Sequence, residues 1–175
     1  MGRCHWKAIE RVRLVCEAFV LWGCLDDDLI HRYRNLSSSD ITALCFDDRQ
    51  RKWIIGNQAG QIQVFNGMNG ALMKEGKSHT SEVTAVNYDV ADKCLISVSW
   101  DRRLRIHDEE SAEKVTELRV VENAHNADIA CLAYSFEASL IATACSNLLI
   151  RVWDFQNVGE PRRFAVSTSF VYPHS

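Results

Sequence analysis

The chain contains three stretches of thirty residues that align with one another without a gap, and this repeat constrains its fold more than any other feature. The stretches are residues 37–66, 79–108 and 125–154, so their first residues lie 42 and 46 positions apart. The last stretch ends in Trp153-Asp154. A unit that recurs at such a period cannot bury its own faces alone. We therefore expect the copies to stack in an array.

Each copy has the alternation of apolar and polar residues that is typical of β-strands. In the middle copy, Val86 and Tyr88 follow a period of two, whereas Val83 lies three residues before Val86, which predicts a β-bulge. A polar turn at residues 101–103 separates two further β-prone runs. Residues 115–121 form a more polar run, which we expect to be the outermost strand. The pattern predicts four antiparallel strands per copy, without a long helix.

The ends of the copies carry a family resemblance. A large residue closes the third predicted strand of each copy, and an Asn or Asp follows it: Phe65-Asn66, His107-Asp108 and Trp153-Asp154. This pattern resembles the WD-repeat β-propellers over roughly residues 19–167. Residues 31–70 and 124–156 are also similar to the WD-repeat proteins that carry EF-hands, which are typical of ciliated and flagellated organisms. The resemblance implies an all-β fold of four-stranded propeller blades.

The repeat also predicts how the chain is divided. Trp22 stands at the aromatic position of an earlier, partial copy. The expected segments are a divergent N-terminal segment (1–18, a short helix or an incomplete strand), a partial blade (19–36), three blades (37–78, 79–124 and 125–167) and the start of a further blade or a tail (168–175). Propellers have four to eight blades, so we expect this chain to be part of a larger propeller.

The resemblance implies a chain of buried hydrogen bonds inside a blade, from a His through a Ser or Thr and an Asp to a Trp. The middle copy offers His79, Ser97 and Asp101, with His107 in place of the Trp. The last copy offers His125, Thr143 and Trp153, with Asn147 in place of the Asp, and the first copy has no such set. Alternative interpretations are a Ser-His-Asp catalytic triad, and a metal-binding or pH-sensing His107. Because the copies share no reactive cleft, the sequence favours a structural network.

The resemblance also implies where a partner binds. In propellers, residues just before and within the bulge of the first strand, and the residue before the turn Asp, lie on one rim near the central channel. The partner-binding residues expected here are Asp40, Thr42, Glu82, Thr84, Trp100 and Asp128. Acids at the same position in three copies favour a partner with a basic segment, and Trp is enriched in interface hot spots. The alternative is a solvated acidic edge, with Trp100 packed on Arg102 or Arg103.

Composition and motifs exclude several function classes. The net charge of −3 does not favour binding of the chain as a whole to nucleic acid or an anionic membrane. Arg102, Arg103 and Arg105 are better explained as a solvated turn. The seven cysteines include no Cys-x-x-Cys pair, which fits reduced thiols inside a cell. No nucleophile elbow, phosphate loop or metal-ligand cluster occurs. We therefore expect no catalytic residues, cofactor, metal or small-molecule substrate.

The sequence thus predicts a non-catalytic, cytoplasmic protein-interaction scaffold within a larger assembly. The narrower resemblance points to a ciliary, flagellar or cytoskeletal assembly. Two alternatives remain open at this point. The chain could be an incomplete propeller fragment without independent activity, or part of a propeller enzyme whose active site lies outside it.

Overall fold

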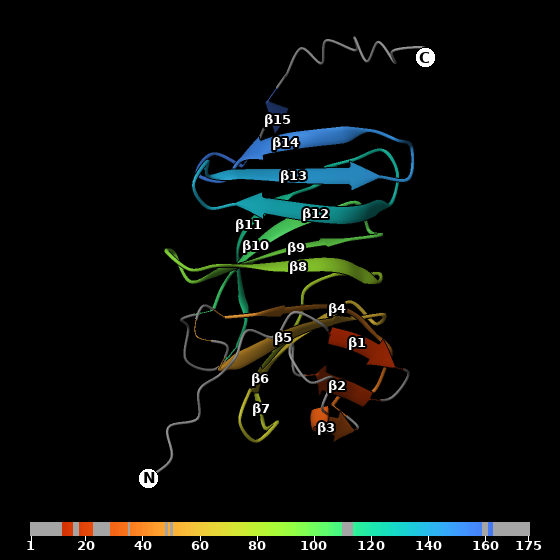
Figure 1. The fold of residues 1–175 in the computed structure, drawn as a ribbon. Helices are drawn as coiled ribbons and strands as arrows, with labels where there is room; N and C mark the ends of the chain where they lie inside the picture. The colour runs from red at the N-terminus through yellow and green to blue at the C-terminus, as the bar shows by residue number, and fades with distance from the viewer. Residues whose placement is uncertain are drawn as a thin grey trace, which may run out of the picture.

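The computed structural model describes residues 12–15, 18–22, 29–34, 36–47, 49, 51–109, 114–158 and 161–162. These residues form β-strands and the turns that connect them, and the described part of the chain contains no helix (Figure 1). The strands are grouped into four sheets, which follow one another along the chain.

The strands of every sheet pair in sequence order, and every pair is antiparallel. The first sheet has three strands, β1 (Val12–Val15), β2 (Ala18–Trp22) and β3 (Leu29–Arg34). The second sheet contains β4 (Ile41–Phe46), β5 (Lys52–Asn57), β6 (Gln61–Asn66) and β7 (Leu72–Lys77). The third contains β8 (Val83–Asp89), β9 (Cys94–Ser99), β10 (Leu104–Asp108) and β11 (Thr116–Val121). The fourth contains β12 (Ile129–Ser135), β13 (Leu140–Cys145), β14 (Ile150–Asp154) and β15 (Pro161–Arg162). The predicted all-β fold with four-stranded blades is confirmed.

The predicted bulge occurs in all three four-stranded sheets. In the third sheet, the register between β8 and β9 shifts between Val83 and Ala85. The second and fourth sheets show the same shift near the start of their first strands, at Ile41/Ala43 and Ile129/Cys131. One extra residue in an alternating strand produces such a shift, because two residues then oppose a single partner.

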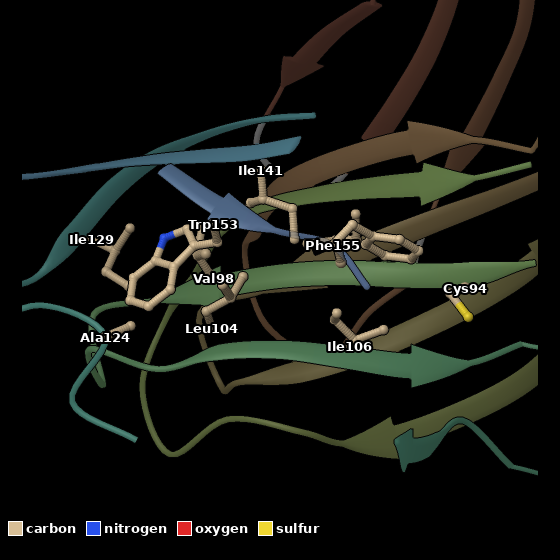
Figure 2. Close-up of a cluster of buried hydrophobic side chains, with 10 residues drawn as sticks. Cys94, Val98, Leu104, Ile106, Ala124, Ile129, Ile141, Trp153 and Phe155 are labelled. Atoms are coloured by element: carbon tan, nitrogen blue, oxygen red, sulfur yellow. The ribbon is translucent and has the colours of Figure 1, made fainter. Parts of the chain in front are cut away.

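Consecutive four-stranded sheets pack face to face through apolar side chains. Figure 2 shows the larger buried cluster, which joins the third sheet to the fourth. Its members include Ile96, Val98, Leu104 and Ile106 from β9 and β10, and Ile129, Ile141, Trp153 and Phe155 from the fourth sheet and its end. A second cluster joins the second sheet to the third and includes Ile54, Ile62, Val64, Val83, Val86 and Leu95. The repeat therefore uses equivalent positions to bury each sheet against the next.

Gly56 allows the second and third sheets to approach each other closely. A Cβ atom at this position would lie 2.5 Å from Cγ1 of the buried Val83. The equivalent positions of the other two sheets hold Val98 and Ala144, which have side chains. The sequence alone gives no reason for a glycine on β5, since the reason lies in the neighbouring sheet.

Parts of the predicted division fall outside the described residues. β1 gives residues 12–15 an extended backbone, while residues 1–11 and 163–175 lie outside the described part. Trp22 is the last residue of β2, and only the backbone of that strand belongs to the described part. The boundaries of the predicted segments stay predictions.

Candidate functional site

Three carboxylate residues occupy equivalent positions, each directly before the first strand of a four-stranded sheet. Asp40 precedes β4, Glu82 precedes β8 and Asp128 precedes β12. In each sheet the backbone carbonyl of the acid accepts a hydrogen bond from the residue after the second strand: Gln58 N to Asp40 O at 2.9 Å, Trp100 N to Glu82 O at 3.1 Å, and Ser146 N to Asp128 O at 3.0 Å. The repeat therefore fixes the backbone of all three acids in the same way.

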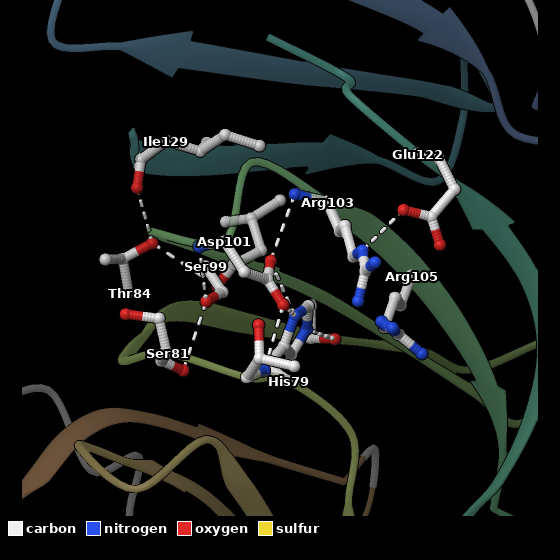
Figure 3. A network of polar contacts seen from close by, with 12 residues as sticks. His79, Ser81, Thr84, Ser99, Asp101, Arg103, Arg105, Glu122 and Ile129 are labelled. Atoms are coloured by element: carbon white, nitrogen blue, oxygen red, sulfur yellow. Dashed lines mark hydrogen bonds and ion pairs between the residues drawn. The ribbon is translucent and has the colours of Figure 1, made fainter. Parts of the chain in front are cut away.

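The first strands of these sheets lie side by side, and two threonines join them. Thr42 Oγ1 donates a hydrogen bond to the carbonyl of Val83 at 2.5 Å, so it connects β4 to β8. Thr84 Oγ1 repeats this contact from β8 to β12, at 2.8 Å from the carbonyl of Ile129 (Figure 3). The acids consequently lie at one end of three neighbouring strands, and we call Asp40, Glu82 and Asp128 the acidic rim. Both threonine hydroxyls are used to hold the sheets together.

The side chains of the acidic rim face solvent to different degrees. Asp40 and Asp128 are exposed, and Glu82 is half-buried. Within the described part of the chain, their carboxylates form no hydrogen bond or ion pair. Trp100, whose backbone amide contacts Glu82, is 46% exposed. A large, exposed aromatic residue thus follows β9 directly and is held by its backbone to Glu82.

The alternative for Trp100 is that it packs on Arg102 or Arg103. Among the described residues, neither Arg102 nor Arg103 forms a cation–π contact with its ring. Arg103 instead pairs with Glu122 (Figure 3). Arg105 pairs with Glu117. Two of the three arginines of the basic cluster therefore pair with acids of the same sheet and its following turn, as expected for a solvated surface.

A buried polar network lies within the third sheet. His79 Nε2 is 2.8 Å from Ser97 Oγ, and His79 Nδ1 is 3.0 Å from Asp101 Oδ2. Burial lowers the pKa of His79, and the nearby Asp101 opposes this effect only partly. A neutral His79 that donates from Nδ1 to Asp101 and accepts at Nε2 from Ser97 satisfies all of these contacts.

His107 extends this network and supplies a donor where a tryptophan is expected. Its Nε2 lies 2.8 Å from Ser97 Oγ, and in the fourth sheet Trp153 Nε1 donates to Thr143 Oγ1 over the same distance. Burial, with the charges of His79 and Arg105, lowers the pKa of His107 to about 3. His107 is therefore neutral near pH 7, and its Nε2–H takes the place of the indole N–H.

The catalytic interpretation of this network does not fit its surroundings. Ser97 is 0% exposed, and its hydroxyl lies between the imidazole rings of His79 and His107. A nucleophile needs access to its substrate, whereas this hydroxyl is enclosed by the sheet. The described residues also include no group of three or more His, Cys, Asp or Glu side chains that could hold a metal ion. The geometry supports a structural role.

The fourth sheet carries a shorter version of the network. His125 Nε2 lies 2.7 Å from Thr143 Oγ1, which also accepts the hydrogen bond from Trp153. His125 Nδ1 is buried without a hydrogen-bond partner. Asn147, at the position equivalent to Asp101, is exposed to solvent. A buried donor without an acceptor lowers the free energy of unfolding. We therefore expect the natural Asn147, which stands where the third sheet has Asp101, to make the fourth sheet less stable.

Replacing Asn147 with aspartate (Asn147→Asp) is expected to raise the free energy of unfolding by about 1 kcal/mol, since it gives His125 Nδ1 the acceptor that His79 has in Asp101. Urea unfolding at pH 7 measures the change. Asn123→Asp is the control, because it adds the same charge on an exposed turn and should leave stability nearly unchanged. Equal effects of the two substitutions would contradict the assignment.

A buried ion cluster between the second and third sheets was missed by the sequence analysis. Lys52 Nζ lies 2.7 Å from Oε1 and 2.9 Å from Oε2 of Glu109, and Lys74 Nζ lies 3.5 Å from Glu109 Oε1. The side chain of Glu109 is only 2% exposed. In the repeat, Glu109 aligns with Phe155, and Lys52 aligns with Cys94. Opposite charges at two positions that are apolar in a neighbouring copy were the feature of the sequence that could have indicated this ion pair.

The comparison with known families follows this repeat. The family model described as WD domain, G-beta repeat, matches residues 70–108 and 116–154. Each match spans the last strand of one sheet and the first three strands of the next, from β7 to β10 and from β11 to β14. In the described residues, no helix is both long and apolar enough to cross a bilayer.

Several curated proteins are similar to parts of the chain. Cilia- and flagella-associated protein 337 B of Tetrahymena thermophila is 27% identical over 86 residues, which cover 49% of this chain and 7% of that protein. The WD repeat-containing protein on Y chromosome of Drosophila grimshawi is 23% identical over 142 residues, covering 80% of this chain and 12% of that protein. WD repeat-containing protein 37 of Mus musculus is 28% identical over 81 residues, which cover 46% of this chain and 16% of that protein.

The chain thus spans between 7% and 16% of the length of these three relatives. The family model matches this chain in the region where the structure has its four-stranded sheets. The matched repeats, the sheets and the relatives together show that this chain carries WD repeats.

Proposed function

We propose that this chain is part of a non-catalytic interaction scaffold, and that the acidic rim binds a basic segment of a protein partner. WD repeats imply a protein-interaction scaffold in general. The observation that supports the finer proposal is the acidic rim itself. Three carboxylates stand at equivalent positions of adjacent sheets, and none has a side-chain partner in the described part of the chain.

The physical basis of recognition is charge complementarity. Carboxylates held at one end of adjacent strands create a negative edge that attracts Lys and Arg side chains and increases the association rate. The attraction is screened by salt, since the charges are exposed. Thr42 and Thr84 contribute by fixing the strands that carry the acids, rather than by offering their hydroxyls to the partner. Trp100 adds an exposed aromatic surface beside Glu82.

The wider setting is part of the same proposal. We propose a cytoplasmic assembly of the cilium, flagellum or cytoskeleton, supported by the similarity to a cilia- and flagella-associated protein. We also propose that the sheets belong to a larger propeller. Ile150 on the fourth sheet is 68% exposed, whereas the equivalent Leu104 is 0% exposed because the fourth sheet covers it. A further blade over Ile150 would bury the same kind of surface.

The acidic rim is tested by binding of a fluorescent oligolysine peptide to the full chain over a range of salt concentrations. The double variant Asp40→Asn/Asp128→Asn is expected to weaken binding about tenfold at low salt and to flatten its salt dependence, because two exposed charges are lost. Fluorescence anisotropy gives the affinity at each salt concentration.

The matched control is Asp92→Asn/Glu137→Gln, which removes two exposed carboxylates from turns at the other ends of the first strands. This variant should bind the peptide as the wild type does. If both double variants weaken binding equally, overall charge explains the attraction and the acidic rim has no special role.

A further inference from the structure

We propose that Leu148 is an apolar anchor for the partner at the acidic rim, and that the basic segment of the partner carries an apolar side chain that packs on it. This inference rests on the proposed function, because it adds a second property to the segment that the acidic rim would bind. Leu148 lies in the turn between β13 and β14, and 96% of it is exposed. Within the described part of the chain, no other large apolar residue is as exposed.

The turn that carries Leu148 lies at the same end of the fourth sheet as Asp128. β12 begins directly after Asp128, and β13, which runs antiparallel to it, ends at Cys145. The backbone amide of Ser146, two residues before Leu148, donates a hydrogen bond to the carbonyl of Asp128 at 3.0 Å. An exposed carboxylate and an exposed leucine therefore share this end of the sheet.

The repeat fixes the backbone of this turn in the same way in all three four-stranded sheets. The amide at the position of Leu148 donates to the carbonyl three residues earlier, at 3.1 Å in each sheet: Gly60 N to Asn57 O, Arg102 N to Ser99 O, and Leu148 N to Cys145 O. The φ angles of Gly60, Arg102 and Leu148 are 81°, 64° and 61°. The turn therefore imposes the left-handed conformation on whichever residue stands at this position.

Leucine is an unfavourable residue for such a position. The left-handed conformation brings a Cβ atom too close to the following carbonyl oxygen, so glycine, asparagine and aspartate adopt it more readily than leucine does. The exposed side chain of Leu148 also adds nothing to a buried cluster of the fold. Neither the backbone nor the packing within this chain explains the leucine, and strained residues of this kind occur at functional surfaces.

The exposure of Leu148 has a different origin from that of Ile150, which lacks a following sheet. Gly60 has no side chain, so Arg102 is the informative equivalent of Leu148. Arg102 is exposed although the fourth sheet follows the third and buries Leu104. A further blade over the fourth sheet would therefore bury Ile150, as Leu104 is buried, and would leave Leu148 accessible, as Arg102 is.

An apolar anchor adds a property that the carboxylates of the acidic rim do not have. Asp128 attracts any Lys or Arg side chain over a distance, and salt screens this attraction. Contact between two apolar side chains needs close approach and is not screened. The other two sheets hold Gly60 and Arg102 at this position, so only the fourth sheet offers leucine there. A basic segment with an apolar side chain would therefore bind in one register, set by Leu148.

The experiment compares two fluorescent oligolysine peptides of equal length and charge, one with a leucine and the other with a glycine at its centre. The full chain is expected to bind the leucine peptide about tenfold more tightly, as burial of one leucine side chain would produce. The ratio of the two affinities should persist at high salt, whereas both affinities fall. Fluorescence anisotropy measures both peptides at each salt concentration. Equal affinities for the two peptides would overturn the proposal.

The variant Leu148→Asn is expected to abolish the preference for the leucine peptide. Asparagine adopts the left-handed conformation readily, so this variant should unfold in urea at the same or a higher concentration than the wild type. The matched control is Met68→Asn. Met68 is 73% exposed in the turn after β6, at the opposite end of the strands, and its replacement should keep the preference. The same loss of preference in both variants would overturn the proposal.

The double variant Asp40→Asn/Asp128→Asn separates this inference from the proposed function. It should weaken the binding of both peptides and retain the preference between them, because it removes charge and leaves Leu148 in place. The salt dependence thus tests the acidic rim, and the ratio of the two affinities tests Leu148, so the two proposals can fail separately.

Discussion

Replacing Glu109 with glutamine (Glu109→Gln) is expected to lower the free energy of unfolding by about 3 kcal/mol. Glu109 is almost completely buried and holds two lysines, of which Lys74 is only 10% exposed. Removing one partner of a buried ion cluster leaves the remaining charges without compensation, which costs more than the cluster itself contributes. Urea unfolding of the full chain, followed by circular dichroism, measures the loss.

The matched control is Glu122→Gln. Glu122 also pairs with an arginine, Arg103, but its side chain is 53% exposed. Exposed ion pairs contribute at most about 1 kcal/mol, so this variant should retain nearly full stability. Similar losses from the two substitutions would show that burial of Glu109 does not determine its contribution.

Acidification is expected to destabilise the protein through His107. The ordinary pKa of 6.5 falls to about 3, chiefly through burial and then through the charges of His79 and Arg105. The unfolded chain binds a proton at this residue below pH 6.5, whereas the folded chain does not, so stability is lost as the pH falls from 6.5 toward 3. Between pH 6.5 and 4.5 this single group accounts for a loss of about 2 kcal/mol.

The other titratable residues of the two polar networks either add to this loss of stability or change stability only at lower pH. Burial also lowers the pKa values of His79 and His125. Burial alone would raise the pKa of Asp101, but the hydrogen bond and charge of His79, with backbone amides, hold it at about 2. The stability that Asp101 contributes is complete above its ordinary pKa of 3.8 and is lost below it, outside the window of this measurement.

The variant His107→Phe tests this assignment, since Phe65 occupies the same position in the first copy of the repeat. It is expected to reduce the loss of stability between pH 6.5 and 4.5 by about 2 kcal/mol. Trp153→Phe is the control, because it changes the equivalent buried position of the fourth sheet without removing a titratable group. It should lower stability at both pH values and leave their difference unchanged. The same pH dependence in His107→Phe and the wild type would contradict the assignment.

The strands of the repeat could be predicted from local spacing, whereas the members of the polar networks were implied by the resemblance to WD-repeat blades. The interval from Val83 to Val86 predicts the bulge that the register shows. The resemblance implies that His79, Ser97 and Asp101 meet, and the structure brings them within hydrogen-bonding distance of one another. His125 Nδ1 lacks a hydrogen-bond acceptor, and Asn147 stands at the position where the third sheet has Asp101.

The contacts between sheets could not be predicted in this manner. Thr42 and Thr84 were expected to face a partner, whereas their hydroxyls bond to the neighbouring sheet. Lys52 and Glu109 are 57 residues apart, and nothing in the spacing of either residue indicates that they meet. Gly56 is explained only by the place of Val83 in the next sheet.

By itself, the sequence determined that the chain forms four-stranded units at a regular period. Periodicity and turn chemistry act over a few residues, so they can be read without knowing how the units pack. The tertiary structure decided which corner between sheets holds the ion cluster of Lys52, Lys74 and Glu109 and which is packed with apolar side chains. It also decided that three carboxylates share one end of adjacent strands. Both outcomes depend on the faces that the sheets present to each other, and those faces are defined only when the sheets stack.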